Sequence, residues 1–140
     1  MGDAFDVKTI PFSVTFMGGT VPVGTSVVHL FQAPTDDQGG GITVLSAFAS
    51  SPDTIATGSA PTFRLLRYSS GAVVEGTIGS QTLGTGGWTA GTPKTWTISD
   101  AFVDESEYIA LECGGTAANA GTAYTNGVHI TGAINYIMGR

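Results

Sequence analysis

The sequence predicts an all-β fold, an antiparallel β-sandwich of about eight strands. Short apolar runs rich in Val, Ile, Leu and Phe recur along the 140 residues and are separated by turn-forming residues. Glycine is abundant, with 21 residues, and shows no collagen-like period. No stretch has the 3.6-residue apolar period of an amphipathic helix. Many short strands joined by tight turns account for all three observations.

The first expected strand, 8–16, shows the clearest alternation in the chain. Every second residue from Ile10 to Phe16 is large and apolar, and the residues between them are polar or proline. This period of two is typical of a strand with one buried face. Pro11 has no N–H to donate to a ladder, which favours a place at the edge of a sheet.

The next two expected strands, 27–33 and 42–49, are apolar on both faces. We therefore expect both to be central strands that are covered on both sides. The residues between them contain Pro34 and the glycines that end at Gly41, and they predict a loop. The spacing allows the two strands either to pair directly or to cross between sheets.

The rest of the chain continues in the same style. The remaining expected strands are 62–69, 73–78, 94–99, 107–113 and 127–138. The first and last strands are both long and amphipathic, as neighbours in one sheet would be. A two-sheet jelly roll fits this layout best, and an immunoglobulin-like sandwich, which would be supported by paired cysteines, is the alternative. We expect an N-terminal arm, 1–7, and one sandwich domain, 8–140.

The inward faces of these strands predict the hydrophobic core. The expected core residues are Ile10, Phe12, Val14, Phe16, Phe31, Val44, Phe48, Trp96, Ile109, Leu111 and Ile130.

Charge excludes several classes of function. Charged residues make up 11% of the chain, and the net charge is −6. The few Lys and Arg residues are scattered, whereas a nucleic-acid surface needs a cluster of them. The same scatter argues against binding to an anionic membrane. We expect neither nucleic acid nor membrane as a partner.

No pattern of catalytic or metal-ligating residues stands out. His29 and His129 lie in separate expected strands, and Cys113 ends an apolar one, so structural roles are expected for all three. The acidic residues between Asp100 and Glu107 lack the spacing of a calcium loop and predict a solvated connection. We therefore expect no enzyme activity, no cofactor and no metal.

Trp88 differs from the other aromatic residues because it lies in a Gly- and Thr-rich stretch rather than in an expected strand. An exposed Trp can stack on a sugar or anchor a protein interface. It can equally fold back over one end of the sandwich. Tyr124, in another weakly patterned segment, is the second candidate for stacking.

Two stretches resemble small structural proteins of tailed bacteriophages. They are GGGITVLSA at 39–47 and WTISDAFVDESEYIALEC at 96–113. Within that group the chain is most similar to jelly-roll capsid decoration, or cement, proteins. The resemblance implies a non-enzymatic homotrimer that is made in the host cytoplasm and sits on the outer surface of the virion head. There it would bridge neighbouring copies of the major capsid protein.

A tail-fibre or carbohydrate-binding β-sandwich module is the alternative function. In either case we expect the partner to be contacted by residues at the arm, the loops and the rim of the sandwich. These expected interface residues are Phe5, Asp36, Asp37, Trp88 and Tyr124.

Overall fold

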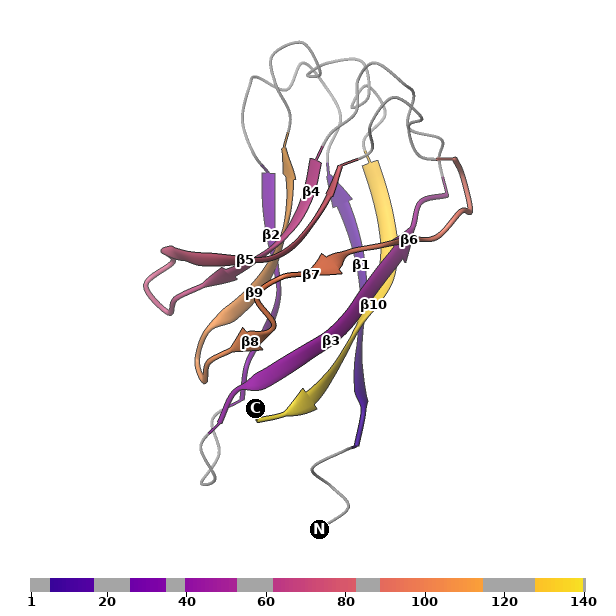
Figure 1. The fold of residues 1–140 in the computed structure, drawn as a ribbon. Coiled ribbons are helices and arrows are strands. Elements are labelled where there is room, and N and C mark those ends of the chain that lie inside the picture. The colour runs from indigo at the N-terminus through magenta and orange to yellow at the C-terminus, as the bar shows by residue number, and fades with distance from the viewer. Residues whose placement is uncertain are drawn as a thin grey trace.

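The structure, a computed structural model, describes residues 6–16, 26–34, 40–52, 62–82, 89–114 and 128–139. These residues form two antiparallel sheets packed face to face (Figure 1). The strands are β1 (Lys8–Phe16), β2 (Ser26–Gln32), β3 (Ile42–Ser50), β4 (Thr62–Tyr68), β5 (Val74–Thr82), β6 (Lys94–Thr95), β7 (Thr97–Ile98), β8 (Phe102–Val103), β9 (Tyr108–Gly114) and β10 (Val128–Met138). The all-β sandwich prediction is confirmed, and no helix occurs in the described part of the chain.

The two sheets interleave strands that are far apart in sequence. Sheet A has the order β1-β10-β3-β6, and β8 also pairs with β3. Sheet B has the order β2-β9-β4-β5-β7. The chain therefore passes back and forth between the two layers.

The first and last strands are neighbours, as their shared amphipathic pattern predicts. β1 pairs with β10 along its whole length, from Lys8 opposite Tyr136 to Phe16 opposite Val128. β1 forms the edge of sheet A, which is the position that Pro11 favours.

The prediction that β2 is a central strand is wrong. β2 forms the edge of sheet B, whereas β3 lies inside sheet A, so the chain crosses between the sheets after β2. The apolar run in β2 has a different cause. The pairing with β9 shifts register between His29 and Phe31, and both Leu30 and Phe31 pack against the core. Consecutive apolar residues here mark a β-bulge rather than burial on two faces.

A second bulge reverses the side-chain alternation within β3. The pairing with β10 places Val44 opposite Tyr136 and Ser46 opposite Asn135, which leaves Leu45 as the extra residue. Before the bulge, Ile42 and Val44 face the core; after it, the buried residues are Ala47 and Ala49. Phe48 therefore points outward and is 42% exposed, so its assignment to the core is wrong.

We expect Phe48→Ala to lower the free energy of unfolding by less than about 1 kcal/mol, because the side chain is already partly in water. Phe12 supplies the comparison, since it is buried on the same sheet and its truncation should cost about 3–5 kcal/mol. Urea denaturation of both variants measures the difference. Equal losses would mean that Phe48 faces the core after all.

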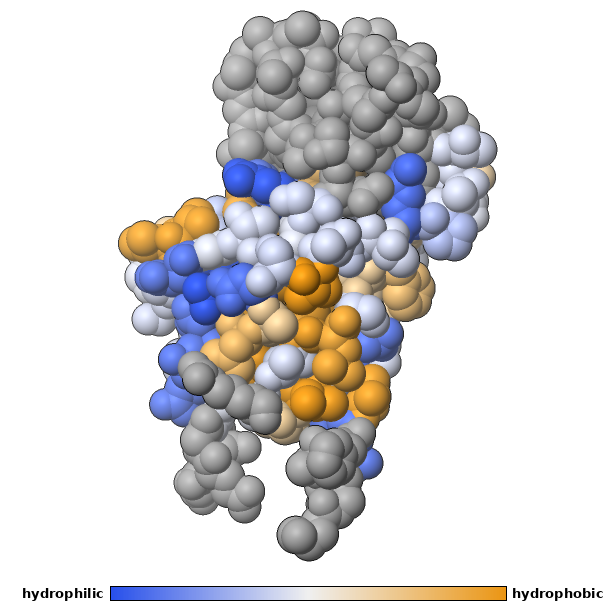
Figure 2. Space-filling model, in the orientation of Figure 1, coloured by the Kyte–Doolittle hydropathy of each residue, from blue (hydrophilic) through white to orange (hydrophobic). Residues whose placement is uncertain are grey.

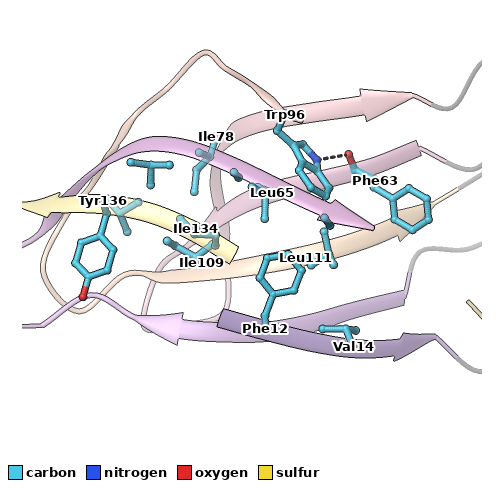
Figure 3. Close-up of a cluster of buried hydrophobic side chains, with 14 of the residues drawn as sticks. Phe12, Val14, Phe63, Leu65, Ile78, Trp96, Ile109, Leu111, Ile134 and Tyr136 are labelled. Carbon is cyan, nitrogen blue, oxygen red and sulfur yellow. Dashed lines mark hydrogen bonds between the residues drawn. The ribbon is translucent and has the colours of Figure 1, made fainter. Parts of the chain in front are cut away.

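The core lies between the sheets (Figure 3). Most of the expected core residues are buried there: Phe12, Val14, Val44, Trp96, Ile109, Leu111 and Ile130. Ile10 and Phe31 are partly buried against this cluster, and the side chain of Phe16 lies outside the described part of the structure. The core also contains residues that were not on the expected list, notably Phe63, Leu65, Ile78, Val103 and Ile134.

The segment from Lys94 to Val103 closes one side of the sandwich. β6 and β8 both pair with β3 of sheet A, whereas β7 between them pairs with β5 of sheet B. Trp96 lies between β6 and β7, with its ring buried and its Nε1–H donating to the carbonyl of Phe63 at 3.0 Å (Figure 3). The single strand expected at 94–99 is thus broken into two short pieces that bridge the sheets.

Candidate functional site

The residues expected at a partner interface lie outside the described part of the chain. This holds for Phe5, Asp36, Asp37, Trp88 and Tyr124. The described residues nevertheless form two outer sheet faces with very different chemistry, and these faces are the candidate functional surfaces.

The two histidines lie on opposite sides of the molecule. His129 is on β10 in sheet A, where its Nδ1 is 2.9 Å from Oγ1 of Thr15 on β1. His29 is on β2 in sheet B, where its ring contacts two tyrosines. The fold therefore does not bring them to one site. Within the described residues, no group of three or more His, Cys, Asp or Glu side chains could hold a metal ion.

The acidic connection before β9 is partly folded inward, so the prediction of a solvated connection needs correction. Asp100 Oδ2 lies 3.1 Å from Nη2 of Arg67, and Glu107 Oε2 lies 3.9 Å from its Nε. Arg67 also donates from Nη1 to the carbonyl of Phe102 at 3.1 Å. Gly76 leaves room for this arrangement, because a Cβ there would lie 3.0 Å from both Arg67 and Asp100. This cluster anchors the connection to β4.

The outer face of sheet A is polar but carries almost no charge. Side-chain hydrogen bonds join its strands: Thr9 to Asn135 at 2.8 Å, Asn135 to Ser46 at 3.0 Å, Ser13 to Thr131 at 3.4 Å and Thr15 to His129 at 2.9 Å. None of the described strands of sheet A contains an acidic residue, and their fixed cations are Lys8 and Lys94. The hydrogen-bonded part of this face is therefore a mostly neutral surface of Thr, Ser, Asn and His side chains.

An apolar strip crosses this polar face. Pro11, Ala133 and Phe48 stand opposite one another on β1, β10 and β3. Leu45, the bulged residue of β3, adds a second exposed apolar side chain. Figure 2, which views the edge of the sandwich, shows apolar side chains over β3 and over the neighbouring short strands β7 and β8. A surface with a central apolar strip and neutral hydrogen-bonding groups around it suits contact with another protein.

The outer face of sheet B is built around an ion pair and three rings. Arg64 on β4 donates from Nε to Oε1 of Glu112 on β9 at 2.5 Å. The Glu112 side chain is only 7% exposed, whereas that of Arg64 is 41% exposed. The hydrogen bond that Arg64 donates to the Glu112 carboxylate raises the pKa of Arg64 above its ordinary value, although burial alone would lower it.

The rings lie beside this pair. His29 on β2 contacts Tyr68 on β4, with ring centroids 5.3 Å apart, and Tyr108 on β9, at 5.2 Å. Leu66 and Ala110 are both buried yet do not belong to the core between the sheets. Their alternation with Leu65 and Ile109 places them on the outer face, next to the rings. Sequence reasoning missed this cluster because its members come from three strands that pair only in the fold.

Scans against protein-family models, curated proteins and solved structures found no match to this chain. No helix in the described residues is long and apolar enough to cross a membrane.

Proposed function

We propose that this chain is a non-enzymatic structural protein of a phage virion, which decorates and stabilises the head by bridging major capsid subunits. The observation that carries the proposal is the outer face of sheet A. Charged groups are depleted at the cores of protein interfaces because their desolvation is unfavourable. A broad strand face without acidic residues can be covered by a partner at little desolvation cost.

The acidic residues are distributed unevenly, and this predicts which side of the molecule would face the capsid. Apart from Asp6, which precedes β1, the described acidic residues lie in sheet B or in the connections on either side of β8, namely Glu75, Asp100, Asp104, Glu105, Glu107 and Glu112. A capsid-bound molecule would turn sheet A toward the shell and leave this ionic side in solvent. A net charge of −6 suits an outer-shell protein that does not meet the packaged DNA.

The strand order supports the jelly-roll form of the proposal. Sheet A joins the first, last and third strands in the order β1-β10-β3, and sheet B contains β2-β9-β4-β5. An eight-stranded jelly roll would alternate between layers in this way if β6 and β8 are pieces of one broken strand beside β3. The resemblance to decoration proteins adds a homotrimer as the expected assembly.

The test is binding to expanded phage heads that lack their decoration protein. We expect the wild-type protein to co-sediment with heads and Thr131→Glu to bind at least about tenfold more weakly, because it buries an unpaired carboxylate in the proposed contact. Thr97→Glu is the matched control: the same substitution at an exposed strand position of sheet B, which should bind as the wild-type does.

Two outcomes would contradict the proposal. One is a wild-type protein that is monomeric at micromolar concentration by light scattering and does not bind the heads. The other is an equal loss of binding in both glutamate variants, which would mean that the outer face of sheet A is not the specific contact surface.

A further inference from the structure

We propose that the outer face of sheet B binds a neutral saccharide, with the rings of Tyr68, Tyr108 and His29 as the stacking surface and Arg64 as the main hydrogen-bond donor. This inference goes beyond the proposed function and does not depend on it, because it concerns the opposite face of the sandwich. It also uses none of the residues that anchor the acidic connection.

Strand register brings the three rings together. Tyr68 on β4 pairs with Tyr108 on β9. His29 on β2 pairs with Ala110, which is two residues after Tyr108 and so lies on the same face of the sheet. The His29 ring is tilted by 46° to Tyr68 and by 32° to Tyr108. Both tyrosines are half-buried and His29 is exposed, so the cluster is fixed by its neighbours while part of it remains open to solvent.

The floor of the surface is rigid and apolar. Leu66 and Ala110 occupy the positions between the ring row and the ion-pair row, and neither is open to solvent. Rings that pack on rigid, apolar side chains are already ordered, so they lose little conformational freedom when a ligand stacks on them.

The ion pair supplies oriented hydrogen-bonding groups at the edge of the rings. Glu112 stands opposite Arg64 in the ladder, two positions along β9 from Ala110. The Nε–H of Arg64 donates to Glu112, so this hydrogen bond leaves the two Nη groups unused, and the Arg64 side chain is 41% exposed. The buried carboxylate fixes the direction in which these donors point.

Charge decides which class of ligand fits. Arg64 and Glu112 together are neutral, and the whole chain carries −6, so a phosphate- or carboxylate-rich ligand gains little attraction. Stacking rings alone can hold nucleobases, but the phosphate backbone also requires a basic groove. A neutral sugar needs neither: its apolar C–H face packs on the rings, and its hydroxyls accept hydrogen bonds from the guanidinium.

The experiment is an array of neutral oligosaccharides, followed by calorimetric titration with the oligosaccharide that gives the strongest signal. We expect Tyr68→Ala and Tyr108→Ala each to weaken binding about tenfold, the loss of roughly one aromatic contact. Arg64→Met should weaken it by a similar factor, whereas Tyr108→Phe should keep most of the affinity because the ring remains. Phe48→Ala is the control, since it removes an exposed ring from the opposite face and should change nothing.

Circular dichroism establishes that each variant is folded. If an alanine variant unfolds, NMR titration of the wild-type protein replaces it: the ring signals of Tyr68 and Tyr108 must shift with added saccharide, and those of Phe48 must not. The proposal is overturned if no neutral saccharide on the array is bound, if the tyrosine variants bind as the wild-type does, or if Phe48→Ala weakens binding as much as they do.

Discussion

Gly132→Ala is expected to lower the free energy of unfolding by about 3 kcal/mol, the upper end of the range for overpacked sites. Gly132 stands opposite Ala49 where β10 pairs with β3. A Cβ on Gly132 would overlap the carbonyl oxygen of Phe48 and lie 2.7 Å from the Cα of Ala49. These are backbone atoms of a strand inside the sheet, so they cannot move aside without disturbing the β3–β10 pairing. Urea denaturation followed by circular dichroism measures the loss.

Gly71→Ala is the matched control. A Cβ at Gly71 would meet only the Oγ of Ser69, at an ordinary distance of 3.7 Å. This exposed turn position should change stability by no more than about 0.5 kcal/mol. A loss below about 1 kcal/mol for Gly132→Ala would show that β3 and β10 can separate to admit a methyl group, contrary to the close approach described above.

Strict alternation made parts of this fold predictable from sequence. In β1, residues from Ile10 to Val14 alternate without interruption, and the strand pairs with β10 without a shift in register. Pro11 also predicted the edge position correctly, because a missing N–H restricts a residue to few places in a sheet. Where a strand has no bulge, its side-chain period alone determines which face is buried.

Bulges account for the main errors. An extra residue at Leu45 shifts the later half of β3 by one position, which moves Phe48 from the core side to the solvent side. A one-residue slip leaves no clear mark in an apolar sequence such as ITVLSAFAS, because either phase places apolar side chains inside. The β2 bulge beside Leu30 likewise shifts the side-chain alternation. It places consecutive apolar residues in an edge strand, a pattern that sequence analysis attributes to a central strand.

The candidate surfaces needed topology as well as composition. The absence of acidic residues from 8–16, 42–50 and 128–138 is visible in the sequence, but only the strand order shows that these segments form one sheet. Likewise, Arg64 and Glu112 are 48 residues apart, and the pairing of β4 with β9 brings them together. Local patterns carry no information about such long-range pairs.

Trp96→Ala is expected to lower the free energy of unfolding by about 3–5 kcal/mol, because a large aromatic ring is removed from a closely packed site. The Trp96 side chain is 4% exposed and belongs to the core between the sheets. Its backbone N–H donates to Ala47 of sheet A at 3.0 Å, and its indole N–H donates to Phe63 of sheet B at the same distance. Trp96 is therefore hydrogen-bonded to both sheets at the point between β6 and β7.

Trp96→Phe separates packing from hydrogen bonding. This variant keeps an aromatic ring in the core but removes the indole N–H, whose hydrogen bond is expected to contribute about 1 kcal/mol. It also leaves a smaller cavity than Trp96→Ala does. The expected order of stability under urea denaturation is wild-type, then Trp96→Phe, then Trp96→Ala. Because Trp96 closes the side of the sandwich away from the β1 and β2 edges, its loss should also raise amide hydrogen exchange in β6 and β7 before that in β1. A Trp96→Ala variant that loses less than about 1 kcal/mol would mean that β6, β7 and β8 hold the sheets together without the ring.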